Sequence, residues 1–282
     1  MTPPTLYIIA TPIGNLEDMT YRAVRILGEV DLIAAEDTRH SLKLLNHFGI
    51  SKPLTSYFDH NQQIKGERIL HALRQGKSVA LISDAGTPCI SDPGYQLVRD
   101  AVAEGIPVVP LPGACAAITA LSASGLPTDT FTFAGFPPSR QGKRRTFLSA
   151  MSALPGTLVL YEAPHRLADT LTDIRELLGE RQVIVARELT KMFEECIRGS
   201  VSEVIDAVSL GIVRGEVVLL VAPGAGAPQE SESLEHVLER LMADGTLSIK
   251  DIAKQAAVIS GVSRSEAYSE ALKMKNVSYE GK

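Results

Sequence analysis

The twelve residues from Ser83 to Gly94 hold the densest group of residue types suited to binding a small ligand. Two aspartates, two glycines and two prolines fall within this stretch, directly after the apolar run 79–82. Small residues let backbone N–H groups approach a ligand closely, and the Asp84 carboxylate accepts hydrogen bonds from a hydroxyl or ammonium group. Asp92 and Pro93 suit the start of a helix, so capping explains part of the pattern. The ligand-binding candidates here are Asp84, Ala85, Gly86 and Thr87.

Two further loops repeat this theme. Residues 11–16 (Thr-Pro-Ile-Gly-Asn-Leu) follow the apolar run 6–10. Residues 110–116 (Pro-Leu-Pro-Gly-Ala-Cys-Ala) begin at the end of the run 108–111 and continue beyond it. The first loop lacks both GxGxxG and a Gly-Lys-Ser/Thr sequence, which disfavours dinucleotides, ATP and the common Rossmann-type methyltransferases. Ligands bind at the carboxyl ends of strands in open α/β sheets. The three loops therefore predict one cleft for a flat ligand with apolar edges and a few polar handles, such as an adenosine-containing cofactor.

Charged clusters follow three other predicted strands. They are Glu36-Asp37-Thr38-Arg39-His40, Tyr161-Glu162-Ala163-Pro164-His165-Arg166 and Ala186-Arg187-Glu188-Leu189-Thr190-Lys191. Helix capping and ion pairs explain each cluster about as well as catalysis does. No HExxH spacing and no GxSxG motif occurs, so we expect neither a metal site nor a serine nucleophile.

A basic run reverses the charge of the chain locally. Residues 137–145 (Pro-Pro-Ser-Arg-Gln-Gly-Lys-Arg-Arg) place four cations within six positions of a protein whose net charge is −5. Glycine and proline beside these cations predict a mobile loop, and the cations suit the phosphates of a polyanionic substrate, although a solvated helix face is the simpler alternative.

Composition limits the class of protein. The 282 residues are 45% hydrophobic and 22% charged, which indicates a globular chain long enough for two domains. No apolar run reaches 18 residues and no basic segment precedes the opening apolar one, so we expect a cytoplasmic protein outside the membrane. Cys89, Cys115 and Cys196 form no CxxC pair, which argues against disulfides and zinc. Aromatic residues make up only 5% and tryptophan is absent, which disfavours a sheet that stacks bases.

The elements that must position these groups fall into an α/β pattern. From residue 6 to 126, strand-length apolar runs alternate with amphipathic segments, which predicts βαβ units around a mostly parallel sheet. In residues 127–222 strands dominate, and the adjacent runs 183–187 and 193–198 predict a hairpin within a mixed sheet. We therefore expect domains at 1–126 and 127–222, a linker at 223–233, and a small helical unit at 234–282 with a helix-turn-helix pattern.

The combination of motifs resembles the tetrapyrrole-methylase superfamily, the class III methyltransferases, and within it the branch that methylates RNA of the small ribosomal subunit. The resemblance covers about residues 6–222 in family order. It rests on the segments 11–16, 34–40, 83–88, 92–94, 110–113, 161–166 and 186–191.

The resemblance implies a homodimer that binds S-adenosylmethionine between its two domains and methylates the 2′-oxygen of a cytidine ribose in 16S rRNA of the 30S subunit, near the decoding centre. Donor contacts then fall on Pro12, Ile13, Gly14, Asp84, Ala85, Gly86, Thr87, Ala114, Cys115, Ala116 and Ala163. The candidates for a catalytic carboxylate are Glu36, Asp37 and Glu188. The candidates for contacts with RNA are Arg39, Arg140, Lys143, Arg144, Arg145 and Arg166.

Two alternatives share parts of this pattern. One is a methyltransferase of a small tetrapyrrole or corrinoid, against which the basic run and the appended helical unit argue, since a porphyrinoid needs neither. The other is a non-catalytic RNA-binding assembly factor that uses the cleft for regulation.

Overall fold

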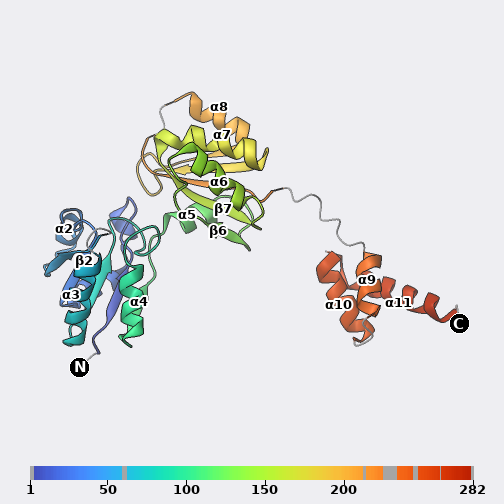
Figure 1. Ribbon diagram of the computed structural model, residues 1–282, viewed down its shortest axis with the longest axis horizontal. Helices are drawn as coiled ribbons and strands as arrows, with labels where there is room; N and C mark the ends of the chain where they lie inside the picture. The colour runs from blue at the N-terminus through green and yellow to red at the C-terminus, as the bar shows by residue number, and fades with distance from the viewer. Residues whose placement is uncertain are drawn as a thin grey trace. The chain divides into compact units, whose positions relative to one another are not determined.

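The computed structural model describes residues 3–58, 62–211, 214–224, 234–243, 247–260 and 262–280. The chain forms two compact units, Met1–Gly224 and Ala225–Lys282 (Figure 1). The first unit contains two five-stranded sheets, and the second contains three helices. The predicted α/β fold with one parallel sheet, one mixed sheet and a helical appendage is confirmed.

The first sheet is parallel throughout and has the strand order β3-β2-β4-β1-β5. Its strands are β1 (Leu6–Ile9), β2 (Leu32–Ala35), β3 (Leu54–Ser56), β4 (Val79–Ile82) and β5 (Val108–Leu111). All four residues of β4 are buried, as expected for a central strand covered on both faces. Because β1 lies between β4 and β5, the loops that follow these three strands are neighbours at one edge.

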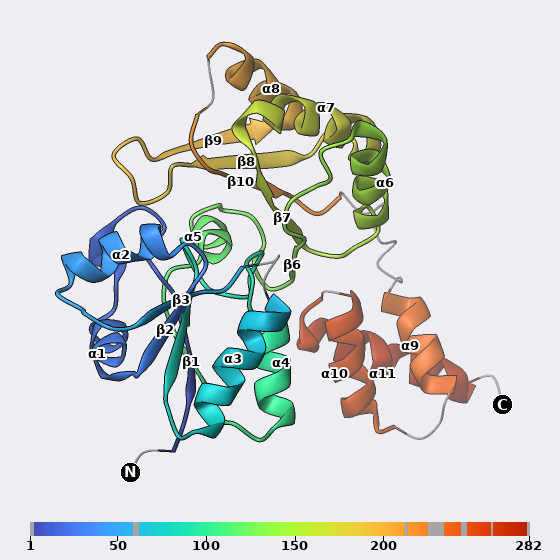
Figure 2. The ribbon, with the colours of Figure 1, turned by 60° about the vertical axis from the view of Figure 1, so that its left-hand side comes forward.

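Helices cover both faces of this sheet. They are α1 (Tyr21–Glu29), α2 (Thr38–His47), α3 (Gln62–Arg74), α4 (Tyr95–Ala103) and the 3-10 turn η1 (Leu16–Asp18). Ile26 and Leu45 of α1 and α2 pack in one core cluster. Leu70 and Leu97 of α3 and α4 pack in another, and these two helices lie side by side (Figure 2).

The second sheet has the order β6-β7-β10-β8-β9, and only its β6–β7 pair is parallel. Its strands are β6 (Phe131–Phe133), β7 (Thr157–Glu162), β8 (Gln182–Arg187), β9 (Glu195–Ser200) and β10 (Val217–Val221). The predicted β8–β9 hairpin is present. One face carries α6 (Gln141–Met151), the 3-10 turn η2 (Pro164–Arg166), α7 (Leu167–Leu178) and α8 (Val201–Ser209).

The helix α5 (Ala116–Ser122) follows the first sheet in the chain but packs on the second sheet. Ala117, Ala120 and Leu121 are buried in the same cluster as Val159 of β7 and Leu220 of β10. Although α5 follows the last strand of the first sheet, its apolar face therefore covers the second sheet. The predicted domain boundary at residue 126 stays a prediction.

The second unit comprises α9 (Leu234–Ala243), α10 (Ile249–Ser260) and α11 (Arg264–Glu280). Its core includes Leu238, Ile252 and Ala271. The hydroxyl oxygen of Ser263 accepts a hydrogen bond from the backbone N–H of Glu266 and caps α11. Most of the predicted linker, residues 225–233, lies outside the described residues. Across the described ranges, no helix has the length and apolar character needed to cross a bilayer.

Candidate active site

A cavity of about 380 Å³ opens where the two sheets of the first unit meet. Its first wall comes from the loops after β1, β4 and β5, through Ile13, Thr87 and Cys115. Its second wall comes from the second sheet, through Tyr161 at the end of β7 and Val217 at the start of β10. The size and the mostly apolar walls are typical of a site for a small organic ligand.

Hydrogen bonds lock the loops of the first wall together. The backbones of Thr11 and Gly86 exchange two hydrogen bonds of 2.9 Å each. The hydroxyl of Thr87 donates to the carbonyl oxygen of Ala114 at 3.0 Å, which ties the loop after β4 to the loop after β5. The wall is thus built before any ligand arrives, and little ordering entropy is lost on binding.

The end of the Ser83–Gly94 stretch is strained. Cys89 and Ser91 hold positive φ angles of 72° and 64°, which residues with a side chain seldom adopt. Gly94 has a φ of 145°, and a Cβ atom there would lie 2.5 Å from the sulfur of Cys89. Only glycine fits this position. Ser91 and Asp92 of this strained segment line the cavity.

Tyr161 supplies a polar group within the apolar second wall. Its hydroxyl oxygen accepts a hydrogen bond from the backbone N–H of Ala117 at 3.3 Å, and its ring packs edge-on against Phe133 with centroids 4.9 Å apart. Burial raises the pKa of Tyr161 to about 12, with a smaller contribution from Cys115. The hydroxyl keeps its proton at neutral pH and can donate it in a hydrogen bond to a ligand.

A second cavity of about 350 Å³ adjoins the first. It is lined by the loop after β1, by His40 and Lys43 of α2, by Asp84, and by Lys191 between β8 and β9. Ile13, Ala85 and Glu216 line both cavities. A ligand in the first cavity and a ligand in the second would therefore meet across these three residues.

The structure divides the predicted donor contacts between the two cavities. The first cavity is lined by Ile13, Ala85, Gly86, Thr87, Cys115, Ala116 and Ala163. The second cavity is lined by Pro12, Gly14 and Asp84, together with Ile13 and Ala85. Ala114 supports the wall of the first cavity through its carbonyl oxygen.

Residues of the first cavity that sequence reasoning missed come mostly from the second sheet. Tyr161 lies in the cluster 161–166, which the sequence places at the end of a strand. Phe136 and Glu216 lie in no sequence motif that predicts a ligand site. Their place in the cavity depends on how the two sheets pack.

The three carboxylates predicted as catalytic are held by fixed contacts. Asp37 caps α2 and pairs with Arg39 at 3.1 Å, and this guanidinium holds the pKa of Asp37 below its ordinary value. The backbone N–H of Asp37 donates to the carboxylate of Asp84 at 3.0 Å. The carboxylate of Glu36 accepts from the backbone N–H of Asp84 at 3.4 Å.

Glu188 pairs with Lys191 at 2.8 Å and accepts from the backbone N–H of Glu216 at 3.1 Å. The hydrogen bond from Lys191 lowers the pKa of Glu188, which weakens it as a base. Neither Glu188 nor Glu36 nor Asp37 is among the residues that line the two cavities, and their catalytic roles stay predictions.

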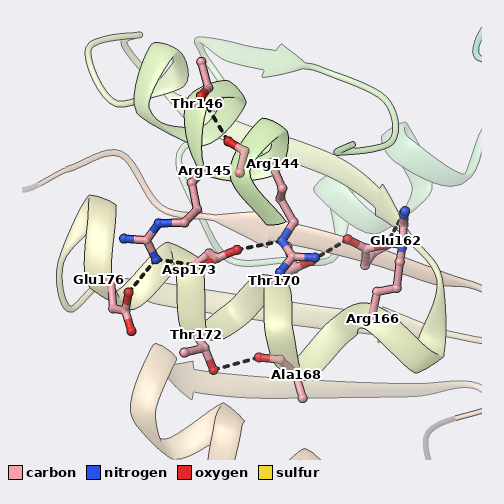
Figure 3. A network of polar contacts seen from close by, with 11 residues as sticks. Arg144, Arg145, Thr146, Glu162, Arg166, Ala168, Thr170, Thr172, Asp173 and Glu176 are labelled. Carbon is pink, nitrogen blue, oxygen red and sulfur yellow. Dashed lines mark hydrogen bonds and ion pairs between the residues drawn. The ribbon is translucent and has the colours of Figure 1, made fainter. Parts of the chain in front are cut away.

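The basic run is the clearest correction to the sequence-based expectations. It begins helix α6 and is not a mobile loop. Arg144 is only 3% exposed and pairs at 2.7 Å with Asp173 of α7, which is itself buried (Figure 3). The predicted contact between Arg144 and RNA is wrong, because solvent does not reach this side chain. Arg145 is partly exposed and shares Asp173 with it, at 2.9 Å. Of the four cations in the run, Arg140 and Lys143 are exposed.

Arg166 also belongs to a buried network. Its guanidinium donates to the carboxylate of Glu162 at 2.8 Å, and the hydroxyl of Thr170 donates to the other oxygen at 2.6 Å (Figure 3). Glu162 also accepts from the backbone N–H of Ala163 at 2.7 Å. The network fixes the turn where Ala163 and Pro164 line the first cavity. The structure thus gives Arg166 a supporting role, and its expected contact with RNA stays a prediction.

Among the residues that the structure describes, no group of three or more histidine, cysteine or acidic side chains is arranged to hold a metal ion. The three cysteines are free and partly buried.

Known proteins similar to this chain share its sequence or its fold. Residues 5–205 match the family described as Tetrapyrrole (Corrin/Porphyrin) Methylases. The chain is 50% identical over 279 residues to a protein of Pseudomonas aeruginosa named Ribosomal RNA small subunit methyltransferase I, covering 96% of this chain and 98% of that one. A protein of Halalkalibacterium halodurans with the same name is 48% identical over 272 residues, covering 94% and 93%.

Solved structures show the same fold at low identity. Uroporphyrin-III-C-methyltransferase from Thermus thermophilus superposes with a TM-score of 0.53 at 22% identity, covering 80% of this chain and 97% of that one. A structure of that enzyme complexed with S-adenyl homocysteine also has a TM-score of 0.53, at 19% identity and covering 78% and 97%. Diphthine synthase has a TM-score of 0.60 at 12% identity, covering 77% and 90%.

Proposed function

Since this chain belongs to the tetrapyrrole (corrin/porphyrin) methylase family, we propose that it transfers a methyl group from S-adenosylmethionine to RNA of the small ribosomal subunit. The observation that carries the proposal is identity at about half of all positions, over almost the whole chain, with relatives named for this activity. The finer proposal is that the acceptor is the 2′-oxygen of a cytidine ribose in 16S rRNA, near the decoding centre of the 30S subunit, and that the enzyme is a homodimer.

The residues of the first cavity suit the methyl donor. Ile13, Leu189 and Val217 offer apolar surface for an adenine ring, and the hydroxyls of Thr87 and Tyr161 offer polar partners at its edge. S-adenosylmethionine supplies an electrophilic methyl group carried on a sulfonium. The protein's part is to hold the acceptor oxygen in line with that group and to keep water out.

A carboxylate that faces the acceptor would help the ribose hydroxyl to lose its proton. Asp84 lines the second cavity, and one of its oxygens is fixed by the backbone N–H of Asp37. We propose that Asp84 receives the proton, with Glu36 and Asp37 as positioning residues and Glu188 as the residue that holds Lys191. Removal of the proton late in the reaction needs only a modest base.

Contacts with the RNA backbone fall to the exposed cations. Arg140 and Lys143 at the start of α6 and Arg39 at the start of α2 remain the proposed phosphate contacts. Buried pairing removes Arg144 from this set.

The experiment that tests the proposal measures methyl transfer from labelled S-adenosylmethionine to three acceptors. These are 30S subunits from cells that lack the modification, a naked oligonucleotide of the same sequence, and a porphyrinoid. We expect labelled rRNA from the 30S subunits, with the methyl group on a cytidine ribose by nuclease digestion and mass spectrometry. Transfer to the porphyrinoid would establish the tetrapyrrole alternative. Binding of the subunit without transfer would establish the assembly-factor alternative.

Light scattering, which measures the mass of the protein in solution, tests the proposed homodimer.

A further inference from the structure

Helix α2 carries four basic side chains and no acidic one, in a chain whose net charge is −5. Arg39 is held by Asp37, but within the described part of the chain no hydrogen bond or ion pair engages the ammonium group of Lys43. His40 and Lys43 are three residues apart, so they share one face of the helix. Both are exposed and both line the second cavity. The face thus offers a cation and a hydrogen-bonding imidazole without a protein partner.

The turn between β8 and β9 forms the opposite side of this cavity. It packs so closely on Gly14 that a Cβ atom there would lie 2.5 Å from the side chain of Lys191 and 2.8 Å from the hydroxyl of Thr190. Glu188 and Thr190 hold positive φ angles of 51° and 68°, so the turn has a defined shape. Phe193, two residues beyond Lys191, is 71% exposed. An exposed aromatic ring in this turn is suited to stacking on an unpaired base.

The dimensions favour a single nucleotide over a duplex. The second cavity measures about 350 Å³, which lies within the range of small-ligand sites. Enzymes that act on one nucleotide of a folded nucleic acid take it out of the stack and bind it in such a pocket. The shared wall of Ile13, Ala85 and Glu216 brings a nucleotide in this cavity against the contents of the first cavity.

We infer that the second cavity receives one nucleotide splayed out of a single-stranded segment of the RNA substrate. Lys43 and His40 bind the phosphate beside that nucleotide, and Phe193 stacks on a base at the mouth. The inference rests on the proposed function and adds to it the place where the acceptor binds.

The test compares two substitutions that remove the same charge. Lys43→Gln alters the second cavity. Lys77→Gln is the control, because Lys77 is exposed at the amino end of β4, whereas the cavity lies at the carboxyl ends of the strands. For each variant, calorimetry measures the affinity for S-adenosylhomocysteine, and filter binding measures the affinity for 30S subunits at several salt concentrations. A third variant, Phe193→Ala, tests the stacking contact.

We expect Lys43→Gln to weaken binding of 30S subunits roughly five-fold near physiological salt and to reduce the log–log salt slope by about one unit, the value for one lost phosphate contact. Phe193→Ala should weaken binding roughly ten-fold without changing the slope. Both variants should bind S-adenosylhomocysteine as the wild type does.

Three results would overturn the inference. Equal effects of Lys43→Gln and Lys77→Gln on 30S binding would show that only overall charge matters. A loss of S-adenosylhomocysteine affinity in Lys43→Gln would assign the second cavity to the donor. A wild-type chain that transfers no methyl group to 30S rRNA would overturn the proposed function, and with it this inference.

Discussion

The carboxylate of Asp84 accepts a hydrogen bond from the backbone N–H of Asp37 at 3.0 Å, across 47 positions of sequence. The contact joins the loop after β4 to the cap of α2, and these segments contribute Asp84, His40 and Lys43 to the second cavity. Asp37, which caps α2, thereby also orients the carboxylate of Asp84.

Asp84→Asn should separate catalysis from donor binding. Asparagine keeps the hydrogen bond with Asp37 and loses the ability to accept a proton, so we expect kcat to fall on the order of 100-fold. The affinity for S-adenosylhomocysteine should stay within about two-fold, as calorimetry would show. Asp92→Asn is the matched substitution in the first cavity, and it should weaken donor binding instead. Weaker donor binding in Asp84→Asn would instead show that Asp84 binds the donor, as the sequence predicts.

Asp173→Ala should destabilise the first unit strongly. The substitution leaves the buried guanidinium of Arg144 without its partner, which costs about 3–5 kcal/mol of unfolding free energy. Urea unfolding followed by circular dichroism measures the change. The double variant Arg144→Met, Asp173→Leu should recover most of the loss, because it removes both charges from the core. Glu176→Ala, which removes an exposed partner of Arg145, should leave the midpoint almost unchanged. An Asp173→Ala variant as stable as the wild type would contradict the buried pairing.

The ion pair between Glu188 and Lys191 should make the β8–β9 turn sensitive to acid. The pKa of Glu188 is lower in the folded protein than its ordinary value of 4.5, so the pair stabilises the fold above that pH. This stabilisation is lost as the pH falls through the folded pKa, below 4.5. The urea midpoint of Glu188→Gln should therefore lie below that of the wild type at pH 7, and the difference should disappear as the pH falls below the folded pKa of Glu188. A difference that stays constant with pH would exclude the ion pair as its cause.

Truncation after Ala227 tests the role of the helical unit. The unit Met1–Gly224 contains both sheets, their cores and both cavities, so the truncated chain should fold and bind S-adenosylhomocysteine with unchanged affinity. We expect a loss of methyl transfer to 30S subunits, because we propose that the helices α9–α11 contact the RNA substrate. Aggregation of the truncated chain would place them in the core or in the dimer interface. Full activity on 30S subunits would leave them without a role in RNA binding.

The first sheet was largely predictable because four of its five strands are local apolar runs, and Val79–Ile82 has the bounds expected from its sequence. The exception is Leu54–Ser56, which contains one apolar residue. Helix α6 was not predictable by the same means. Its buried face includes Arg144, whose charge interrupts the apolar periodicity, and its partner Asp173 lies 29 positions away. The position of the three loops of the first wall was also predictable, because the carboxyl ends of parallel strands lie at one edge of a sheet. Tyr161 and Glu216 enter the site only through packing between sheets, which no local pattern encodes.

The packing of α5 on the second sheet also limits the order in which the chain can fold during its synthesis. The apolar face of α5 is covered partly by β7, and the cover is complete only when β10 pairs between β7 and β8, about 100 residues later in the chain. At ordinary translation rates of about 5–20 residues per second, synthesis of the chain from α5 to β10 takes roughly 5–20 s. During that interval the nascent chain leaves part of the face with Ala117, Ala120 and Leu121 exposed to solvent, where a chaperone can bind it.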